Sequence, residues 1–343
     1  MGEIVTRRAL IAMLAIALLA LTPPLASAAK RSWAQREIKL VTARGLMTAS
    51  GGSFRPDDSL THGELTQLVS GLTAEPTRVP AGATGGVTIA QLDAQLVGAL
   101  GLGDEATLFY RAARAAGIKP PARFGREVVA RLLGLRYNHP AAEDGLELMW
   151  SDQATRAEAA YSAAQILRFR GWETAWVEEE AAQLELPELT ELQQRILTYA
   201  FGLVGYPYVW GGTSTTRQAP FGVDAPGGFD CSGFLWQVYK LRAYAGAEGL
   251  GDAIRGRTAA QMAGEVGRAK RIGFAKLEPG DLLFFGSGGP RAKAASVDHA
   301  GIYVGSGWMV HSSRYGVALA KLDGWYRERF AWGRRPLAEA GLA

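Results

Sequence analysis

The chain has 343 residues, of which 48% are hydrophobic and 20% are charged, and its formal net charge is +4. This length predicts two or three domains, and the composition is ordinary for a globular protein. The basic residues are scattered and form no stripe with interleaved aromatic residues, so nucleic-acid binding has little support. A single cysteine excludes an internal disulfide.

The first 28 residues have the layout of a secretory signal peptide. Arg7 and Arg8 precede an apolar run from Ala9 to Leu21, and the small-residue triplet at residues 26–28 follows as a cleavage site. The run is shorter than the ~20 apolar residues of a membrane span, although an uncleaved anchor is the alternative. We therefore expect residues 1–28 to direct secretion from a bacterial cell.

The next region has the pattern of helices joined by turns. Apolar residues share one face of a predicted helix over residues 36–44, and Gly45 ends it. A loop with Phe54 and a Pro-Asp-Asp turn follows, and Thr61 with Glu64 forms a capping box that starts a second helix. This helix, loop and capped helix resemble a surface-layer homology (SLH) repeat.

Two further segments carry weaker versions of this pattern. Residues 91–101 and 108–118 are predicted to be helical, and residues 120–129 form a degraded loop and capped helix. Residues 149–160 contain the run Thr-Arg-Ala-Glu at 155–158, the best match in the chain to the capped-helix signature. We therefore predict three divergent repeats in an all-α domain at residues 30–171.

The SLH resemblance implies a compact helical trimer of repeats that binds secondary cell-wall polymers, with Arg156 in the polymer-binding groove. The alternative is that these helices form a spacer or a lid over the second domain. Residues 172–190 are acidic, and we interpret them as a helix followed by an interdomain linker. The run of three glutamates at residues 178–180 is expected on a solvated helix face.

The single cysteine, Cys231, lies between a Gly-rich loop and a predicted buried helix over residues 232–239. A thiol at a helix N-terminus is favoured as the thiolate by the helix dipole and by free N–H groups. The alternative is a small, inert buried side chain, which is the commonest role of a free cysteine.

Two of the four histidines fall in one predicted β-hairpin. Residues 298–305 and 307–313 form its strands, and this places His299 and His311 as near-opposite neighbours. A thiol nucleophile needs a base, and the base needs an orienting group, so Cys231, His299 and His311 can fill these roles. A zinc-type Cys/His/His site and ordinary core histidines are the alternatives.

Several motifs of the C-terminal half occur in the order and spacing of the NlpC/P60 cysteine peptidases. They are Tyr-Val-Trp-Gly-Gly at 208–212, Phe-Asp-Cys-Ser-Gly at 229–233, Arg-Thr-Ala-Ala-Gln at 257–261, Pro-Gly-Asp-Leu-Leu-Phe-Phe at 279–285, His-Ala-Gly-Ile-Tyr-Val-Gly at 299–305 and Met-Val-His at 309–311. The resemblance implies an α+β fold, with a papain-like NlpC/P60 domain at residues 191–340. Its nucleophile helix would pack on an antiparallel sheet that carries the base.

The same resemblance implies the roles of individual residues. Cys231 would attack a peptide carbonyl, with His299 as the base and His311 as its orienter. Tyr208 matches a tyrosine that positions or polarises the substrate, and Asp230 and Ser232 match positions that receive the free amino end of a short stem peptide. Asp230 is equally suited to be an ordinary helix N-cap.

The family resemblance implies a secreted, wall-associated peptidoglycan hydrolase that cleaves stem peptides, most often at the γ-D-glutamyl–diamino acid bond, without a metal or organic cofactor. A catalytically silent wall-binding or adhesion protein and a thiol amidase or acyltransferase are the alternatives. Residues 215–227 are longer than in the shortest family members, and they either alter substrate access to the cleft or form a tolerated surface loop.

Overall fold

The computed structural model describes residues 32–48, 53–75, 83–138 and 146–342. Trp33–Ala343 form one compact unit. The predicted signal peptide at residues 1–28 lies outside the described residues. Within the described ranges, no helix combines the length and the apolar character that a membrane crossing requires.

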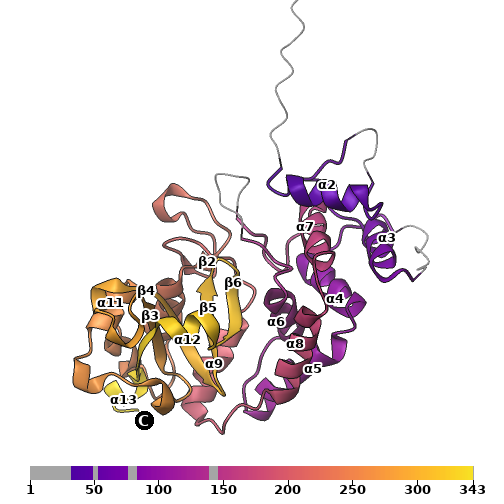
Figure 1. The fold of residues 1–343 in the computed structure, drawn as a ribbon. Helices are drawn as coiled ribbons and strands as arrows, with labels where there is room; N and C mark the ends of the chain where they lie inside the picture. The colour runs from indigo at the N-terminus through magenta and orange to yellow at the C-terminus, as the bar shows by residue number, and fades with distance from the viewer. Residues whose placement is uncertain (1–31, 49–52, 76–82, 139–145, 343) are drawn as a thin grey trace, which may run out of the picture. The chain divides into compact units, whose positions relative to one another are not determined.

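The N-terminal half of the described chain is helical, as predicted (Figure 1). Three of its helices begin at a threonine N-cap, whose hydroxyl accepts a hydrogen bond from the backbone N–H of the third helical residue; they are α3 (His62–Thr73), α4 (Ile89–Ala99) and α7 (Arg156–Ile166). The other helices of this half are α2 (Gln35–Ala43), α5 (Gly103–Ala115), α6 (Phe124–Leu132) and α8 (Trp172–Gln183).

The three capped helices start beside one another. Antiparallel backbone bridges join the loops before them in pairs: Ser59–Thr155, Thr61–Gly86 and Thr88–Gln153. The second capped helix is therefore α4, not the segment at residues 120–129 that the sequence pattern indicates. The reason is local, because Thr88 and Gln91 form a complete capping box, whereas α6 follows Arg123 without a side-chain cap.

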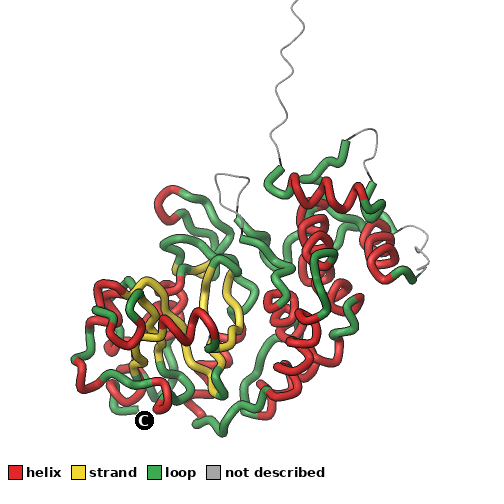
Figure 2. The backbone as a smooth tube through the Cα atoms, viewed as in Figure 1, coloured by secondary structure: helices red, strands yellow, loops and turns green. Residues whose placement is uncertain are grey.

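The C-terminal half is built on a five-stranded antiparallel sheet with the strand order β6-β5-β4-β3-β7 (Figures 1 and 2). Its strands are β3 (Leu282–Gly286), β4 (Val297–Gly305), β5 (Trp308–Ser313), β6 (Gly316–Lys321) and β7 (Phe330–Arg334). The hairpin of β4 and β5 is the predicted one. The edge strands β6 and β7 are additional to those that the sequence pattern indicates, and the architecture confirms the predicted α+β class.

Short helices and a small second sheet surround this sheet. They include α9 (Glu191–Gly202), β1 (Thr213–Ser214), β2 (Gly228–Phe229), α10 (Cys231–Leu235), the π-helical turn η2 (Trp236–Leu241), α11 (Ala259–Gly264), α12 (Gly324–Arg329) and α13 (Pro336–Glu339). Residues 208–212 form a loop in which Tyr208 makes a single bridge to Phe229. Helix α10 packs against β4 and β5, which fixes where the cysteine lies.

Helix α6 of the repeat region packs directly against the end of α9. Phe124 stacks on Phe201 with ring centroids 4.8 Å apart. Arg123 donates hydrogen bonds of 3.0 Å to the carbonyl oxygens of Gly202 and Val204. An aromatic stack and charged hydrogen bonds together hold the helical half against the sheet-containing half.

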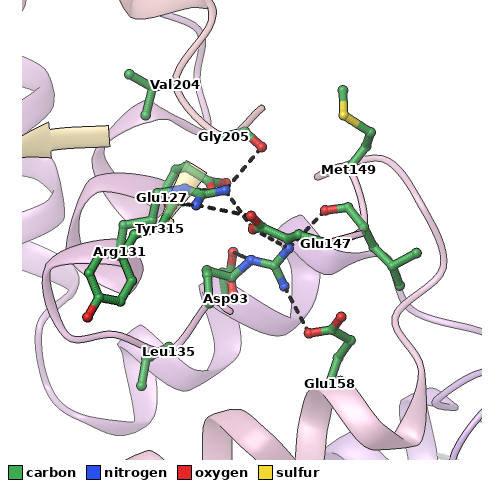
Figure 3. A network of polar contacts seen from close by, with 12 residues as sticks. Asp93, Glu127, Arg131, Leu135, Glu147, Met149, Glu158, Val204, Gly205 and Tyr315 are labelled. Atoms are coloured by element: carbon green, nitrogen blue, oxygen red, sulfur yellow. Dashed lines mark hydrogen bonds and ion pairs between the residues drawn. The ribbon is translucent and has the colours of Figure 1, made fainter. Parts of the chain in front are cut away.

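A buried arginine connects α6 to two loops of the C-terminal half (Figure 3). The side chain of Arg131 is 1% exposed, and its guanidinium pairs with Glu127 and Glu147, each at 2.8 Å. The same guanidinium donates to the carbonyl oxygen of Gly205 at 3.1 Å and to that of Tyr315. The path of both loops therefore depends on this side chain.

A second buried arginine, Arg136, extends this network. It pairs with Glu147 at 3.0 Å and with Asp93 and Glu158 at 3.7 Å each. Burial, which outweighs the opposing effect of Arg136, raises the pKa of Asp93 to about 8. The raised pKa reflects the cost of burying this carboxylate, which Arg136 offsets only in part.

We expect Arg136→Met to lower the free energy of unfolding by about 3–5 kcal/mol, because Glu147 and Glu158 would lose a buried cation. Urea denaturation followed by circular dichroism measures the change. The matched control is Arg217→Met, which removes an exposed ion pair with Asp224 and should leave the urea midpoint almost unchanged. Equal, small shifts in the two variants would contradict a structural role for the network.

Candidate active site

Cys231 is the first residue of α10, and the preceding residue caps the helix. Asp230 Oδ1 accepts hydrogen bonds from the backbone N–H of Gly233 and from the Ser232 hydroxyl. A Cβ atom at position 233 would lie 1.9 Å from the carbonyl oxygen of Gly212. The Cys-Ser-Gly sequence thus lets the nucleophile helix start tightly against the loop that precedes β1.

The thiol of Cys231 lies beside the strand that carries the first histidine. Helix α10 packs against this strand, and the backbone of Ala300, the residue after His299, is one of the groups that act to lower the pKa of the thiol. Burial, followed by the nearby Cys231 and Asp230, raises the pKa of Tyr208 above its usual value, so its hydroxyl stays protonated. A cavity of about 720 Å³ is lined by Tyr208, His299, Ser313, Arg314, Tyr315, Trp325 and Tyr326.

The two histidines of the β4–β5 hairpin are in direct contact. His299 Nε2 and His311 Nδ1 are 2.7 Å apart. The strand register places His311 opposite Gly301, so the histidines are diagonal neighbours instead of the near-opposite pair predicted. Gly305 pairs with Trp308, and an irregularity between Tyr303 and Gly305 then moves His311 from the position opposite Ile302 to the position opposite Gly301, on the same face of the sheet as His299. Position 301 also has to be small, because a Cβ atom there would lie 3.1 Å from His311 Cβ.

Aromatic side chains of α12 and β3 enclose the histidine pair. The hydroxyl of Tyr326 lies 3.5 Å from His311 Nε2, and Trp325 and Phe285 pack around His299. The sequence pattern does not predict these roles. The only available signal was the adjacent Trp-Tyr pair at the start of α12, which is not specific enough to assign a site.

Burial determines the charge state of the site. It raises the pKa of Cys231 to about 12, with a further contribution from Asp230, and backbone hydrogen bonds oppose this only in part. Burial lowers the pKa of His299 to about 4, and burial together with His299 lowers that of His311 well below its usual value. At neutral pH the site therefore holds a neutral thiol and two neutral imidazoles.

The neutral thiol of Cys231 differs from the expectation that the helix N-terminus favours the thiolate. The reason is that the cost of burying a charged sulfur outweighs the favourable backbone contacts. A neutral His299 can still accept the thiol proton. If the ring proton of His299 is on Nε2, this N–H donates a hydrogen bond to His311 Nδ1. Nδ1 of His299 is then the basic nitrogen. His311 then carries its own proton on Nε2, facing Tyr326.

Arg257 holds the two residues that were predicted to receive an amino group. Its guanidinium donates to both carboxylate oxygens of Asp230 at 3.1 Å and to the Ser232 hydroxyl at 2.9 Å. The N–H of Gly211 also donates to Asp230, at 3.0 Å. Asp230 is therefore an N-cap and an ion-pair partner in this structure, and an incoming ammonium group would be an additional partner.

Arg156 does not lie in an open groove. It is 4% exposed, and its guanidinium donates to the carbonyl oxygens of Phe54 and Thr48 and pairs with Glu64. These contacts tie the third capped helix to the first repeat loop. This position differs from the one expected for a polymer-binding residue, because its hydrogen-bonding groups face the interior.

Residues 215–227 form a loop closed by a bridge between Gln218 and Ala225. Phe221 at its tip is 82% exposed, and it lines a separate cavity of about 270 Å³ that also includes Tyr208 and Trp210. The loop therefore lies next to the candidate site.

Among the residues that the structure describes, no group of three or more His, Cys, Asp or Glu side chains is arranged to hold a metal ion.

Comparison with known proteins matches two segments of the chain to family models. Residues 205–335 match the NlpC/P60 family, and residues 28–66 match the S-layer homology domain. The first match contains Cys231, His299 and His311. The second contains α2 and the first capping box.

Curated relatives match the C-terminal half. The chain is 35% identical over 124 residues to "Probable endopeptidase Rv2190c" of Mycobacterium tuberculosis (strain ATCC 25618 / H37Rv), which covers 36% of this chain and 24% of the relative. It is 34% identical over 124 residues to the gamma-D-glutamyl-L-lysine dipeptidyl-peptidase of Bacillus subtilis (strain 168), covering 36% of this chain and 33% of the relative. The chain thus spans a third or less of the length of these relatives.

Among solved structures, an NlpC/P60 family protein from Bacillus cereus ATCC 10987 is 27% identical to this chain. The match covers 45% of this chain and 42% of the other, with a TM-score of 0.33.

The charge state of the site predicts how Cys231 reacts with iodoacetamide. Because a raised thiol pKa keeps the sulfur protonated, the alkylation rate should increase by about tenfold per pH unit from pH 7 to 10, without a plateau. Rates measured by intact-protein mass spectrometry test this, with a short unstructured cysteine peptide as the control, whose rate should level off above pH ~8.5. A plateau that begins below pH 7 would indicate a thiolate–imidazolium pair and would contradict the neutral site.

Proposed function

We propose that this chain, which carries an NlpC/P60 domain at residues 205–335 and an S-layer homology segment at residues 28–66, is a secreted, cell-wall-associated peptidoglycan hydrolase. It cleaves stem peptides with Cys231 as the nucleophile, His299 as the base and His311 as the orienting residue. The observation that carries the proposal is the 2.7 Å contact between the imidazoles of His299 on β4 and His311 on β5, the two strands against which the helix that begins at Cys231 packs.

In the first step, Nδ1 of His299 takes the thiol proton while the sulfur of Cys231 attacks the carbonyl carbon of the scissile amide. The oxygen of the tetrahedral intermediate then carries negative charge. Tyr208 lies beside the thiol and keeps its hydroxyl proton, so it is suited to donate a hydrogen bond to this oxygen. His311 holds the imidazole of His299 in the required tautomer and orientation.

In the second step, the imidazolium of His299 gives its proton to the leaving nitrogen, the C–N bond breaks, and a thioester with Cys231 remains. Water then attacks this thioester with His299 as the base, which releases the acid and restores the thiol. The net reaction consumes one water molecule per amide bond. All proton transfers use side chains of the site, and no metal or organic cofactor takes part in this sequence.

The name of the Bacillus subtilis relative supports the γ-D-glutamyl–diamino acid bond as the one cleaved. The acidic groups of such a stem peptide need a cationic partner in the cleft. Arg314 lines the active-site cavity and lies over the ring of Tyr315, which makes it a suitable partner for a substrate carboxylate. We assign the free amino end of the stem peptide to Asp230 and Ser232, where it would share the carboxylate with Arg257.

The SLH segment supports attachment to secondary cell-wall polymers. Because Arg156 is buried, we expect other groups of the repeat region to make the main contacts with such a polymer.

Digestion of a purified tripeptide, L-Ala-γ-D-Glu-diamino acid, tests the hydrolase activity. We expect the wild-type protein to release L-Ala-γ-D-Glu and the diamino acid, as detected by mass spectrometry, and Cys231→Ala to release neither. His299→Ala should lower kcat by at least about 100-fold, because the general base is lost. Leu241→Ala, which shortens an exposed side chain outside the site, is the control. The same product set from wild type and Cys231→Ala would refute the thiol mechanism.

Sedimentation with purified cell walls tests the role of the repeat region. The full chain with Cys231→Ala should bind intact walls and lose most of this binding once the secondary polymers have been extracted. Using the inactive variant keeps the walls undigested during the measurement. Equal retention before and after extraction would leave the helices as a spacer or a lid.

A further inference from the structure

A cavity of about 850 Å³ lies where the helical half meets α9, and none of the proposed catalytic residues lines it. Its lining includes Gly117 and Lys119 from the loop between α5 and α6, one side of α9 within residues 194–202, and residues 242–245 after η2. It shares no lining residue with the active-site cavity. A ligand bound here would therefore meet a different set of side chains from those that meet the stem peptide.

Three basic side chains line this cavity, and no aspartate or glutamate does. They are Lys119, Arg195 and Arg242, and all three are exposed to solvent. Within the described part of the chain, none of them has a carboxylate partner, whereas Arg131 and Arg334 are each paired with a glutamate. Like charges around one cavity repel one another and raise the local concentration of anions. The lining therefore favours an anionic ligand.

The wall of the cavity restrains both guanidinium groups. Arg195 donates a hydrogen bond of 2.6 Å to the carbonyl oxygen of Ala245, and the guanidinium of Arg242 lies 4.8 Å from the ring centroid of Tyr199. Burial raises the pKa of Tyr244, while Arg242 and Arg195 both act to lower it, so both cations lie near this hydroxyl. Because a guanidinium has five N–H donors, most donors of both arginines remain for a ligand.

Two neutral hydroxyl groups of the wall can act as further donors. Thr198 Oγ1 accepts the backbone N–H of Lys119 at 3.0 Å, and Tyr199 Oη accepts a side-chain amide N–H at 2.6 Å. Each hydroxyl therefore keeps its own proton to donate. The carbonyl oxygen of Gly202, which also lines the cavity, accepts a hydrogen bond from Arg123. The cavity is thus rich in donors that come from separate segments of the chain.

We propose that this cavity binds a phosphate group of an anionic cell-wall polymer. The oxygens of a phosphate group point in several directions, which suits donors from separate segments, whereas the two oxygens of a carboxylate lie in one plane and can be bound by a single guanidinium. The volume of about 850 Å³ is typical of sites for ligands larger than one inorganic phosphate ion. This inference goes beyond the proposed hydrolase function and rests on it only for the location at the wall.

The site would give the chain a point of attachment in addition to the SLH segment at residues 28–66. Because the two cavities have different linings, the polymer and the stem peptide would bind at the same time. Attachment through a charged polymer would then keep the Cys231 site open to its substrate.

Isothermal titration calorimetry with the full-length wild-type chain tests the site. The probes are poly(glycerol phosphate), inorganic phosphate and poly-L-glutamate, and dissociation constants are expressed per charged group. Low ionic strength is used, because salt screens exposed charges. We expect poly(glycerol phosphate) to bind at least about tenfold more tightly than either other probe, because it alone combines phosphate groups with a chain that fills the cavity.

A pair of charge-matched double variants locates the binding. Arg195→Gln with Arg242→Gln should weaken the binding of poly(glycerol phosphate) by at least about tenfold, because two charge-assisted donor groups are lost. The control is Arg268→Gln with Lys270→Gln, which removes two exposed cations outside the cavity and should change the dissociation constant by about twofold or less. Thermal melting followed by circular dichroism checks that both variants are folded.

Equal losses of affinity in the two double variants would mean that net charge alone determines binding, and would overturn the site. Poly-L-glutamate or inorganic phosphate that binds as tightly as poly(glycerol phosphate) would overturn the assignment to a phosphate-bearing polymer. Hydrolysis of the tripeptide by the wild type decides the proposed function separately. Saturating poly(glycerol phosphate) should leave this rate unchanged, and a fall in the rate would contradict a site separate from the cleft.

Discussion

The interaction on which the arrangement of the two halves depends is the burial of the Arg131 guanidinium between them. A buried cation requires several acceptors, and here they come from both sides: carboxylates of Glu127 and Glu147, and carbonyl oxygens of Gly205 and Tyr315. Since the Tyr315 loop lines the cavity around His299, a contact made inside the helical half determines the shape of the candidate cleft.

Burial has a second consequence at the reacting groups. Partial burial of the Cys231 sulfur and of the His299 ring, and full burial of the His311 ring, favour the neutral forms of these groups. A neutral thiol is a weak nucleophile until a base takes its proton. The 2.7 Å histidine contact is therefore central, because it occupies Nε2 of His299 and leaves Nδ1 as the nitrogen that takes the thiol proton in the proposed mechanism.

Local sequence patterns predict the elements that carry the candidate residues, including the β4–β5 hairpin and the helix that begins at Cys231. They do not predict the electrostatics, because the pKa of Cys231 depends on burial by elements distant in sequence. The buried position of Arg156 was hidden for the same reason, since its partners lie about 100 residues earlier. The aromatic shell of Trp325 and Tyr326 has no distinctive spacing and needs the fold to be recognised.

The central claim is that the single thiol of the chain performs the hydrolysis. Because Cys231 is the only cysteine, one alkylation event per chain can be counted by intact-protein mass spectrometry and compared with the remaining rate of stem-peptide hydrolysis. The account predicts that the rate falls in direct proportion to the modified fraction and reaches zero when every chain carries one adduct on Cys231. Fully modified protein that still hydrolyses the peptide at the original rate would contradict it.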